Sequence, residues 1–242
     1  IIEAPTGRGK TLAIALAIIH ECMQSNKTPK VLWVTPMRAL ARDTAAQLTD
    51  IFTFFYPDIS VLLRTSDSSS YQKKKARLNK WDIMITTPES CALFSTYQDM
   101  MAGLSTVSVV VIDEWHVLVH QKRGILFELF LSWLSSFNLS YKRWALSATL
   151  ASIQDAMHVL SPSSVVSHIK DTFNKQISGD ILLPETDDYT FKYLGKQLLA
   201  QLIDRIKSVK SCLVFTNTRS QSEQWFQLLL SSGAFQPHEL AI

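Results

Sequence analysis

The chain has 242 residues, and with 47% hydrophobic and 19% charged residues it is not intrinsically disordered. Lysine and arginine number 24 against 21 acidic residues, and a net charge of +3 is too small to indicate nucleic-acid binding by itself. No apolar run approaches the ~18 residues of a membrane span, and Cys22, Cys91 and Cys212 lack metal-ligand spacing, so a membrane protein and a zinc site are excluded and a reducing, cytoplasmic setting is expected.

Short runs rich in Val, Ile and Leu alternate with segments of helical periodicity. The expected strands are Val31–Thr35, Ile83–Thr86, Val107–Ile112, Trp144–Ser147 and Leu213–Phe215. The expected helices are Thr11–Met23, Arg38–Phe55, Glu89–Met101, Gly124–Phe137, Gly195–Lys210 and Gln221–Leu230. Strands without polar alternation are typical of a parallel sheet covered on both faces, so the order predicts a doubly wound α/β fold.

The alternation of strands and helices breaks after Leu150, where Ser161–Ser164 and Ser178–Asp180 interrupt the chain. We therefore expect a first domain over residues 1–160, a linker over 161–194 and the start of a second domain over 195–242. The chain begins with Ile1 rather than Met. We expect an internal fragment of a longer protein, in which the second domain is cut off.

A glycine-rich loop, Ala4–Thr11, lies between the apolar pair Ile1–Ile2 and an apolar helix. Glycines in such a loop let backbone N–H groups approach phosphate oxygens, the lysine reaches the β- and γ-phosphates, and the hydroxyl that follows it binds Mg²⁺. A glycine turn capping an ordinary helix is the alternative, and Ala4 stands where the strict motif has glycine. The pattern predicts an ATP site formed by Thr6, Gly7, Arg8, Gly9, Lys10 and Thr11, with Thr11 on the metal.

Two carboxylates, Asp113 and Glu114, follow the apolar run Val107–Ile112. At the carboxyl end of a buried strand they would face the crevice where ligands bind in α/β sheets. Asp113 is expected to hold Mg²⁺ and Glu114 to polarise the attacking water. An acidic turn is common by itself, but together with the phosphate loop the pair indicates one nucleotide site, with Lys10, Asp113 and Glu114 as its catalytic residues.

His116 follows the acidic pair, and Ser147, Ala148 and Thr149 follow another predicted strand. Neighbouring strand ends in one sheet would bring the imidazole and the hydroxyls together. A histidine with only a structural role is the alternative. We expect His116 to join the catalytic group and Ser147, Ala148 and Thr149 to couple the nucleotide site to the rest of the protein.

In this order, these motifs resemble those of superfamily 2 DEXH-box helicases. Thr35–Ala41 and Thr86–Ser90 are similar to two nucleic-acid-contacting motifs, and Val214–Arg219 is similar to the fourth motif, which starts the second domain. The resemblance covers nearly the whole chain. It implies a RecA-like doubly wound parallel sheet domain followed by the truncated start of a second RecA-like domain, with ATP and Mg²⁺ as cofactors.

Within that superfamily, Thr86–Ser90, Gln121–Gly124 and Trp144–Leu150 are similar to Lhr-type helicases. Thr35–Thr44 and Phe215–Glu223 look closest to a bacterial branch associated with DNA ligase and the DNA damage response. The resemblance implies ATP-driven 3′-to-5′ movement on single-stranded DNA in the bacterial cytosol, unwinding that includes RNA–DNA hybrids, a role in DNA repair, and a DNA ligase or nuclease as partner.

Helicases of this type hold the sugar–phosphate backbone rather than base edges. The resemblance implies that the nucleic-acid contacts are made by Thr35, Pro36, Arg38, Arg64, Thr86, Thr87, Pro88, Thr216, Asn217 and Arg219. The segment Arg64–Lys80 also carries six basic residues against Asp67 alone, a local charge of +5. This run is either a surface that follows a phosphate chain or a solvated basic helix face.

The fifth and sixth motifs of the family, and its adenine-reading glutamine segment, are missing from the sequence. Because the sixth motif supplies an arginine finger, we expect the fragment alone to bind nucleotide poorly and to be inactive. Two other functions remain open: an ATP-gated nucleic-acid clamp without turnover, and a duplex translocase that does not separate strands.

Overall fold

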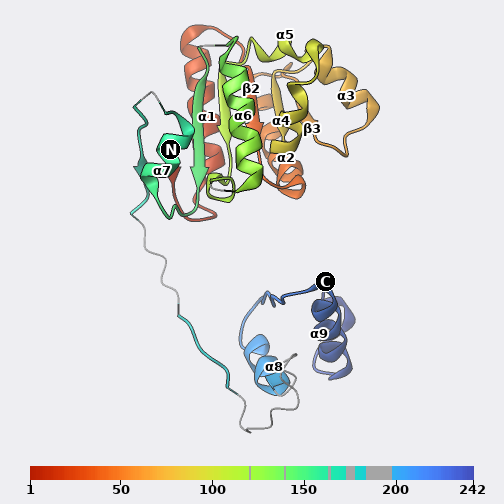
Figure 1. Cartoon of the computed structure of the whole chain (residues 1–242). Coiled ribbons are helices and arrows are strands. Elements are labelled where there is room, and N and C mark those ends of the chain that lie inside the picture. Colours follow the sequence, from red (N-terminus) through yellow and green to blue (C-terminus); the bar gives the residue numbers. More distant parts are fainter. Residues whose placement is uncertain (120, 139, 163–164, 173–177, 184–197) are drawn as a thin grey trace. The chain divides into compact units, whose positions relative to one another are not determined.

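The computed structural model describes residues 1–119, 121–138, 140–162, 165–172, 178–183 and 198–242. The chain forms two compact units, Ile1–Asn174 and Lys175–Ile242 (Figure 1). The first unit continues past the expected boundary at residue 160 because Ile169–Lys170 adds a strand to its sheet beside Ile2–Glu3. The interior of the expected linker, residues 173–177 and 184–194, lies outside the described residues.

The first unit is built on a parallel sheet of seven strands in the order β3-β4-β2-β5-β6-β1-β7. The strands are β1 (Ile2–Glu3), β2 (Val31–Val34), β3 (Val61–Arg64), β4 (Ile83–Thr86), β5 (Val109–Ile112), β6 (Lys142–Ser147) and β7 (Ile169–Lys170). Every residue of β2, β4 and β5 is buried, as expected for strands covered on both faces. The predicted doubly wound α/β fold is confirmed.

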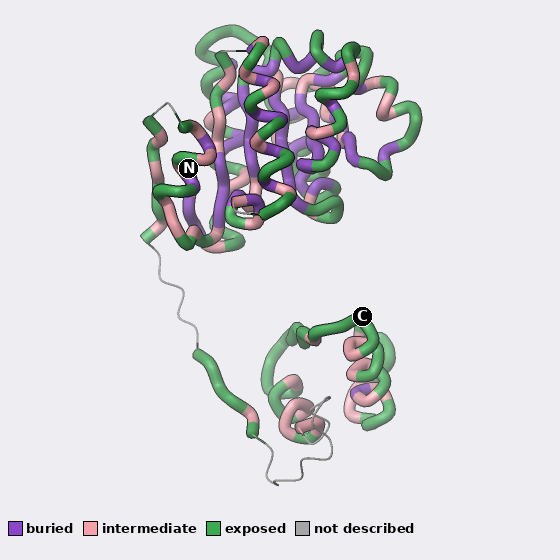
Figure 2. Tube along the Cα trace, in the orientation of Figure 1, coloured by how far each residue is buried: buried purple, intermediate pink, exposed green. Residues whose placement is uncertain are grey.

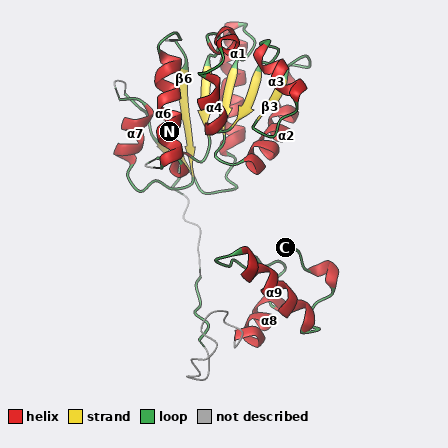
Figure 3. Ribbon diagram, turned by 45° about the vertical axis from the view of Figure 1, so that its right-hand side comes forward, coloured by secondary structure: helices red, strands yellow, loops and turns green. Residues whose placement is uncertain are grey.

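Helices cover both faces of the sheet, and the buried strands run between them (Figures 2 and 3). On one face, α1 (Lys10–Ser25) and α2 (Arg38–Phe55) form a core with Trp33 and Ile85. On the other face, α4 (Pro88–Phe94), α5 (Met101–Leu104), α6 (Lys122–Ser135) and α7 (Ile153–Leu160) pack over alternate strand residues. The remaining helical elements of this unit are α3 (Ser70–Arg77), η1 (Gln98–Met100) and η2 (Trp115–Val117).

The single helix expected over Glu89–Met101 is wrong: the segment divides into α4, η1 and the start of α5. The hydroxyls of Ser95 and Thr96 donate to the carbonyl oxygens of Ala92 and Leu93 at 2.7 Å each. Such local bonds compete with helix continuation and end α4 there. In the described part of the chain, no helix is long and apolar enough to cross a bilayer.

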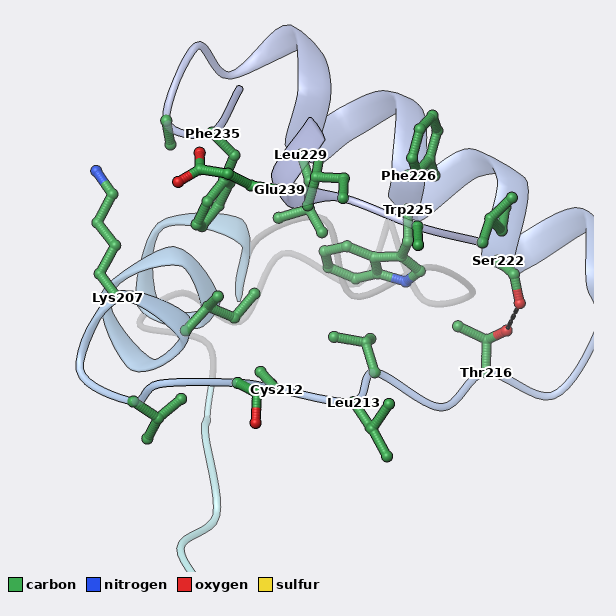
Figure 4. Close-up of a pocket in the computed structure, with 18 of the residues that line it drawn as sticks. Lys207, Cys212, Leu213, Thr216, Ser222, Trp225, Phe226, Leu229, Phe235 and Glu239 are labelled. Atoms are coloured by element: carbon green, nitrogen blue, oxygen red, sulfur yellow. Dashed lines mark hydrogen bonds between the residues drawn. The ribbon is translucent and has the colours of Figure 1, made fainter. Parts of the chain in front are cut away.

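The second unit contains α8 (Leu199–Lys207), α9 (Arg219–Ser231) and the short helix η5 (Pro237–Glu239). The expected strand Leu213–Phe215 is wrong, since a strand needs a hydrogen-bonded neighbour and the described residues of this unit form none. Leu213 and Phe215 are consequently 82% and 88% exposed. Leu213 lines a cavity of about 660 Å³ with Trp225, Phe226 and Leu229 of α9 (Figure 4).

Candidate active site

The glycine-rich loop connects β1 to α1, whose first residue is Lys10. Gly7 and Gly9 have φ of +82° and +74°, a region that favours glycine, and a Cβ built on either would meet nothing within 4 Å. The Lys10 ammonium donates to the carbonyl oxygens of Ala4 at 2.6 Å and Pro5 at 3.2 Å. The backbone of the loop therefore surrounds an open hollow, and the Lys10 ammonium lies against it. This arrangement suits an anionic phosphate.

Arg8, the side chain between the two glycines, points away from this hollow to another element. Its Nε lies 3.0 Å from a carboxylate oxygen of Asp171, just after β7. The pair is partly exposed, so it contributes little to stability. The expected role of Arg8 in holding ATP therefore reduces to its backbone N–H in this arrangement.

Asp113 and Glu114 follow β5 and lie in a partly buried turn. Glu114 has φ of +46°, an uncommon value for a residue with a side chain, and its N–H donates to the Asp113 carboxylate at 2.9 Å. Burial, with the neighbouring Glu114 charge, raises the pKa of Asp113, while the Lys10 ammonium opposes that rise. Lys10 is thus close enough to the acidic pair to influence its charge, as one nucleotide site requires.

One carboxylate oxygen of Glu114, Oε2, is buried and has no hydrogen-bond partner in the described chain. A buried polar atom without a partner is costly, and such atoms often belong to sites that hold a ligand or water. Among the described residues, no group of three or more His, Cys, Asp or Glu side chains gathers around a common point. Mg²⁺ needs no such cage, since it usually takes one or two protein oxygens with phosphate and water, so Thr11 and Asp113 could hold it.

His116 and Ser147 meet as expected from the neighbouring strand ends. His116 Nδ1 lies 3.0 Å from Ser147 Oγ, which donates in turn to the Thr149 carbonyl oxygen at 2.7 Å. Because the serine proton is used there, His116 Nδ1 is the donor to Ser147 Oγ. The backbone N–H of Ala4 also donates to the Ser147 carbonyl oxygen at 3.0 Å. Ser147 thus contacts both the phosphate loop and His116, which lies two residues after Glu114.

Six of the side chains expected to hold nucleic acid are buried: Thr35, Pro36, Arg64, Thr86, Thr87 and Pro88. Arg64 is 6% exposed, donates to the Thr65 carbonyl oxygen at 2.7 Å and lies over the Phe94 ring. Thr86 Oγ1 donates to the Arg64 carbonyl oxygen at 2.6 Å, and Thr35 is fully buried beside it. The side chains of Arg64, Thr86 and Thr35 hold strand ends together, so a contact with nucleic acid would have to come from their backbone groups.

Arg38, Pro36, Thr87 and Pro88 lie at the same edge of the sheet, in the segments that follow β2 and β4. Arg38 is exposed, and its guanidinium meets both oxygens of the Asp67 carboxylate at 2.7 and 2.8 Å. Thr87 caps α4 and Pro88 is its first residue. We still expect Arg38 to bind a phosphate at this edge, after its ion pair with Asp67 is broken.

The sequence reasoning missed Arg123, at the start of α6. Its guanidinium donates both to the Pro36 carbonyl oxygen and to the Glu89 carboxylate. Arg123 therefore joins the two segments that were expected to contact nucleic acid. Arg123 lies within Gln121–Gly124, a segment that is similar to Lhr-type helicases but in which no residue was predicted to have a role.

The second-unit residues Thr216, Asn217 and Arg219 lie at the start of α9. Thr216 Oγ1 is 2.7 Å from Ser222 Oγ, and the Asn217 N–H donates to the Gln221 side chain at 3.1 Å. Arg219 is 94% exposed at its side chain and pairs with Glu223 one turn later. Their expected contact with nucleic acid stays a prediction.

Comparison with known proteins agrees with this geometry. The family model for DEAD/DEAH box helicases matches residues 1–156. The chain is 33% identical over 243 residues to the ATP-dependent helicase Lhr-Core of Sulfolobus acidocaldarius, covering 93% of this chain and 28% of that protein. It is 27% identical to the Lhr helicase/uracil glycosylase of Escherichia coli, over 93% of this chain and 17% of that protein.

Among solved structures, the chain is similar to the helicase Lhr of Mycobacterium smegmatis bound to ssDNA and AMP-PNP. The TM-score is 0.78 at 27% identity, covering 96% of this chain and 32% of that one. The chain thus spans less than a third of the length of these relatives. The resemblance to Lhr-type helicases is confirmed, while the narrower bacterial branch stays a prediction.

Proposed function

The chain belongs to the DEAD/DEAH box helicase family, and from that premise we propose that the full protein is an Lhr-type helicase that uses ATP and Mg²⁺ to move along single-stranded DNA. The Mycobacterium smegmatis relative, solved with ssDNA and AMP-PNP, supports single-stranded DNA as substrate. The Escherichia coli relative, named as both helicase and uracil glycosylase, supports a role in DNA repair. We also propose 3′-to-5′ movement, RNA–DNA hybrids among the substrates, and a DNA ligase or nuclease as partner, in the cytoplasm.

The observation that carries the proposal is the convergence of three motifs on adjacent strands. β5, β6 and β1 are neighbours in the sheet, and the acidic pair, Ser147 and the phosphate loop follow them in that order. Ligands of open α/β sheets bind at the carboxyl ends of the strands. Phosphate cradle, metal carboxylate and coupling serine therefore share one edge.

Each of these residues has a defined task in the proposed reaction. Backbone N–H groups of Gly7–Lys10 would hold phosphate oxygens, and Lys10 would exchange its bonds to Ala4 and Pro5 for one to phosphate. Thr11 and Asp113 would hold Mg²⁺, which neutralises charge on the phosphates. Glu114, whose Oε2 accepts no hydrogen bond from the described residues, would orient the attacking water and accept its proton.

Coupling to movement is assigned to the contact between His116 and Ser147. His116 Nδ1 also lies 3.5 Å from Glu114 Oε2, so the imidazole sits between the acid and the serine. A change of charge at Glu114 would therefore be felt by the hydrogen bond to Ser147. From Ser147, the Thr149 carbonyl oxygen and the residues after β6 would carry the change onward.

The test is steady-state ATP hydrolysis by the full-length protein, wild type beside Glu114→Gln, without polynucleotide, with single-stranded DNA and with single-stranded RNA. We expect hydrolysis that DNA stimulates and that the substitution abolishes. Glu21→Gln, which removes an exposed carboxylate on α1, is the matched control. Stimulation by RNA alone would overturn the DNA assignment. Absence of turnover with nucleotide-dependent DNA binding retained would establish the clamp instead.

Polarity and strand separation need a second assay. Partial duplexes with a 3′ or a 5′ single-stranded tail are incubated with ATP and the displaced strand is measured. We expect displacement only from the 3′-tailed substrate. Displacement from neither, with ATP hydrolysis retained, would indicate a translocase that does not separate strands.

A further inference from the structure

Helix α3 (Ser70–Arg77) carries three consecutive lysines that the described chain does not neutralise. Lys73, Lys74 and Lys75 form no ion pair with any described residue. Arg77 differs, since it lies 3.8 Å from Asp99 and stacks over Tyr97. Lys80, after the helix, also forms no ion pair with a described residue, and the three lysines of the helix are here called the lysine cluster of α3.

The lysine cluster lies on a helix whose two ends are held by hydrogen bonds. Ser69 and Gln72 form a reciprocal capping box at its start, with the Gln72 N–H donating to Ser69 Oγ at 3.3 Å. At its end, Ala76 is buried, and Trp81, itself buried, donates through Nε1 to the Ala76 carbonyl oxygen at 3.2 Å. The charges are thus presented by an ordered element, which lowers the entropy cost of binding.

An exposed aromatic residue accompanies the lysines. Tyr71 is 75% exposed, and it shares a helix face with Lys74 and Lys75 at spacings of three and four residues. Surfaces that bind single-stranded nucleic acid combine cations for the backbone with aromatic rings on which bases stack. Tyr71 and the lysines beside it have that composition.

The helix is also continuous with the expected nucleic-acid edge. It packs against β3, the edge strand of the sheet (Figure 1). The turn between them contains Asp67, which pairs with Arg38, and β3 ends at Arg64, whose carbonyl oxygen accepts from Thr86. A strand held near Arg38 would reach α3 by continuing along this edge.

We propose that the lysine cluster of α3 and Tyr71 bind the sugar–phosphate backbone and a base of single-stranded nucleic acid as it continues past Arg38. The inference rests on the proposed function and adds a contact outside the helicase motifs. Of the two interpretations of the basic segment Arg64–Lys80, it favours a surface that binds a phosphate chain over a solvated helix face. Its ligand is a single strand, because stacking on Tyr71 needs an unpaired base.

The salt dependence of binding tests this proposal directly. The full-length protein binds a fluorescent single-stranded oligonucleotide across a series of salt concentrations, and the slope of log affinity against log salt is measured. Each phosphate contact on a single strand contributes about 0.7 to that slope, so the variant Lys73→Gln/Lys74→Gln/Lys75→Gln should lose up to about 2. Tyr71→Ala should bind the oligonucleotide at least about fivefold more weakly than wild type, and its salt slope should be unchanged.

Lys27→Gln is the control for Lys74→Gln, since Lys27 is an exposed lysine just before β2, away from the edge that holds Arg38. We expect the slope to change in Lys74→Gln and not in Lys27→Gln. Equal slopes in wild type and triple variant, with wild-type binding intact, would overturn the proposal and leave the helicase function standing. A loss confined to duplex DNA would overturn it as well. A wild type that binds no nucleic acid would instead count against the helicase function.

Discussion

Arg123 and Glu89 form an ion pair that joins the starts of α6 and α4, and the same guanidinium donates to the Pro36 carbonyl oxygen. Although burial opposes it, the hydrogen bond from Arg123 holds the pKa of Glu89 below its usual range. One side chain thus fixes the relative position of the segments after β2 and β4. We therefore expect Arg123 to affect nucleic-acid binding at this edge by positioning these segments rather than by direct contact.

Replacing Arg123 by Gln is expected to weaken binding of single-stranded DNA with little effect on nucleotide binding. Because the pair is half exposed, we assign it about 1 kcal/mol, which corresponds to about a fivefold weaker Kd. Fluorescence anisotropy with a labelled oligonucleotide measures the change. Arg123→Lys keeps the charge but cannot reproduce the planar two-partner contact, so it should fall between wild type and Gln. An unaltered DNA affinity in Arg123→Gln would remove the positioning role.

Replacing Asp113 by Asn is expected to stabilise the nucleotide-free protein while abolishing Mg²⁺-dependent ATP binding. Asp113 is partly buried beside Glu114, and an amide oxygen can still accept the hydrogen bond from the Glu114 N–H. The substitution therefore removes like-charge repulsion without losing that bond. Thermal unfolding without nucleotide should show a higher Tm for the variant, and a lower Tm would contradict this account.

The same group predicts a pH dependence of known sign. Burial and Glu114 raise the pKa of Asp113 above its ordinary 3.8. In the pH window between 3.8 and the raised pKa, the folded state therefore binds more protons than the unfolded state. The free energy of unfolding of nucleotide-free wild type should therefore fall as pH rises through that window. Asp113→Asn should lack this component. Metal affinity should change in the opposite direction, because only the ionised carboxylate binds Mg²⁺.

Gly124 makes a close contact that forbids any side chain. A Cβ built there would lie 1.9 Å from the Leu118 carbonyl oxygen, and backbone atoms cannot yield as a flexible side chain does. Gly124→Ala should destabilise the first unit by about 2 kcal/mol, lowering Tm by roughly 5 °C. A Cβ on Gly179 would meet nothing within 4 Å, so Gly179→Ala is the control. Equal Tm values for the two variants would show that α6 can shift without a loss of folding stability.

The sequence predicted that the residues of the proposed nucleotide site meet at one edge of the sheet, because the signals for strand ends are local. Lys10 and Asp113 come after β1 and β5, Ser147 is the last residue of β6, and parallel strands bring such positions to one edge. Arg64 was placed on the surface because a charged residue is seldom buried, and its cover by Phe94 depends on tertiary packing. The hydrogen bonds of Arg123 could not be predicted from a local sequence pattern either, since its partners lie in two other segments.

Element prediction failed where the local signal was weak or the partner was missing. β3 was overlooked because its four residues are only alternately buried at the sheet edge and end in Arg64. The short helix α3 has a polar, lysine-rich sequence without an apolar stripe. Leu213–Phe215 shows the reverse case, in which apolar sequence alone does not make a strand without a neighbour.

Ser147→Ala should separate ATP hydrolysis from strand displacement. Ser147 Oγ is buried, receives a hydrogen bond from His116 and donates one to the Thr149 carbonyl oxygen, yet contacts neither Lys10 nor Asp113 through any hydrogen bond of the described chain. Losing two neutral hydrogen bonds is worth about 1–2 kcal/mol, so displacement per ATP hydrolysed should fall about tenfold.

The coupling experiment measures both rates on the same 3′-tailed duplex. Ser147→Thr, which keeps a hydroxyl at the bonding position, is the matched control and should retain part of the displacement activity if its added methyl group fits. His116→Ala should reproduce the defect of Ser147→Ala, and the double variant should be no worse than either, because both remove the same contact. Additive losses in the double variant would mean that the two residues act separately, and the bond between them would then carry no coupling.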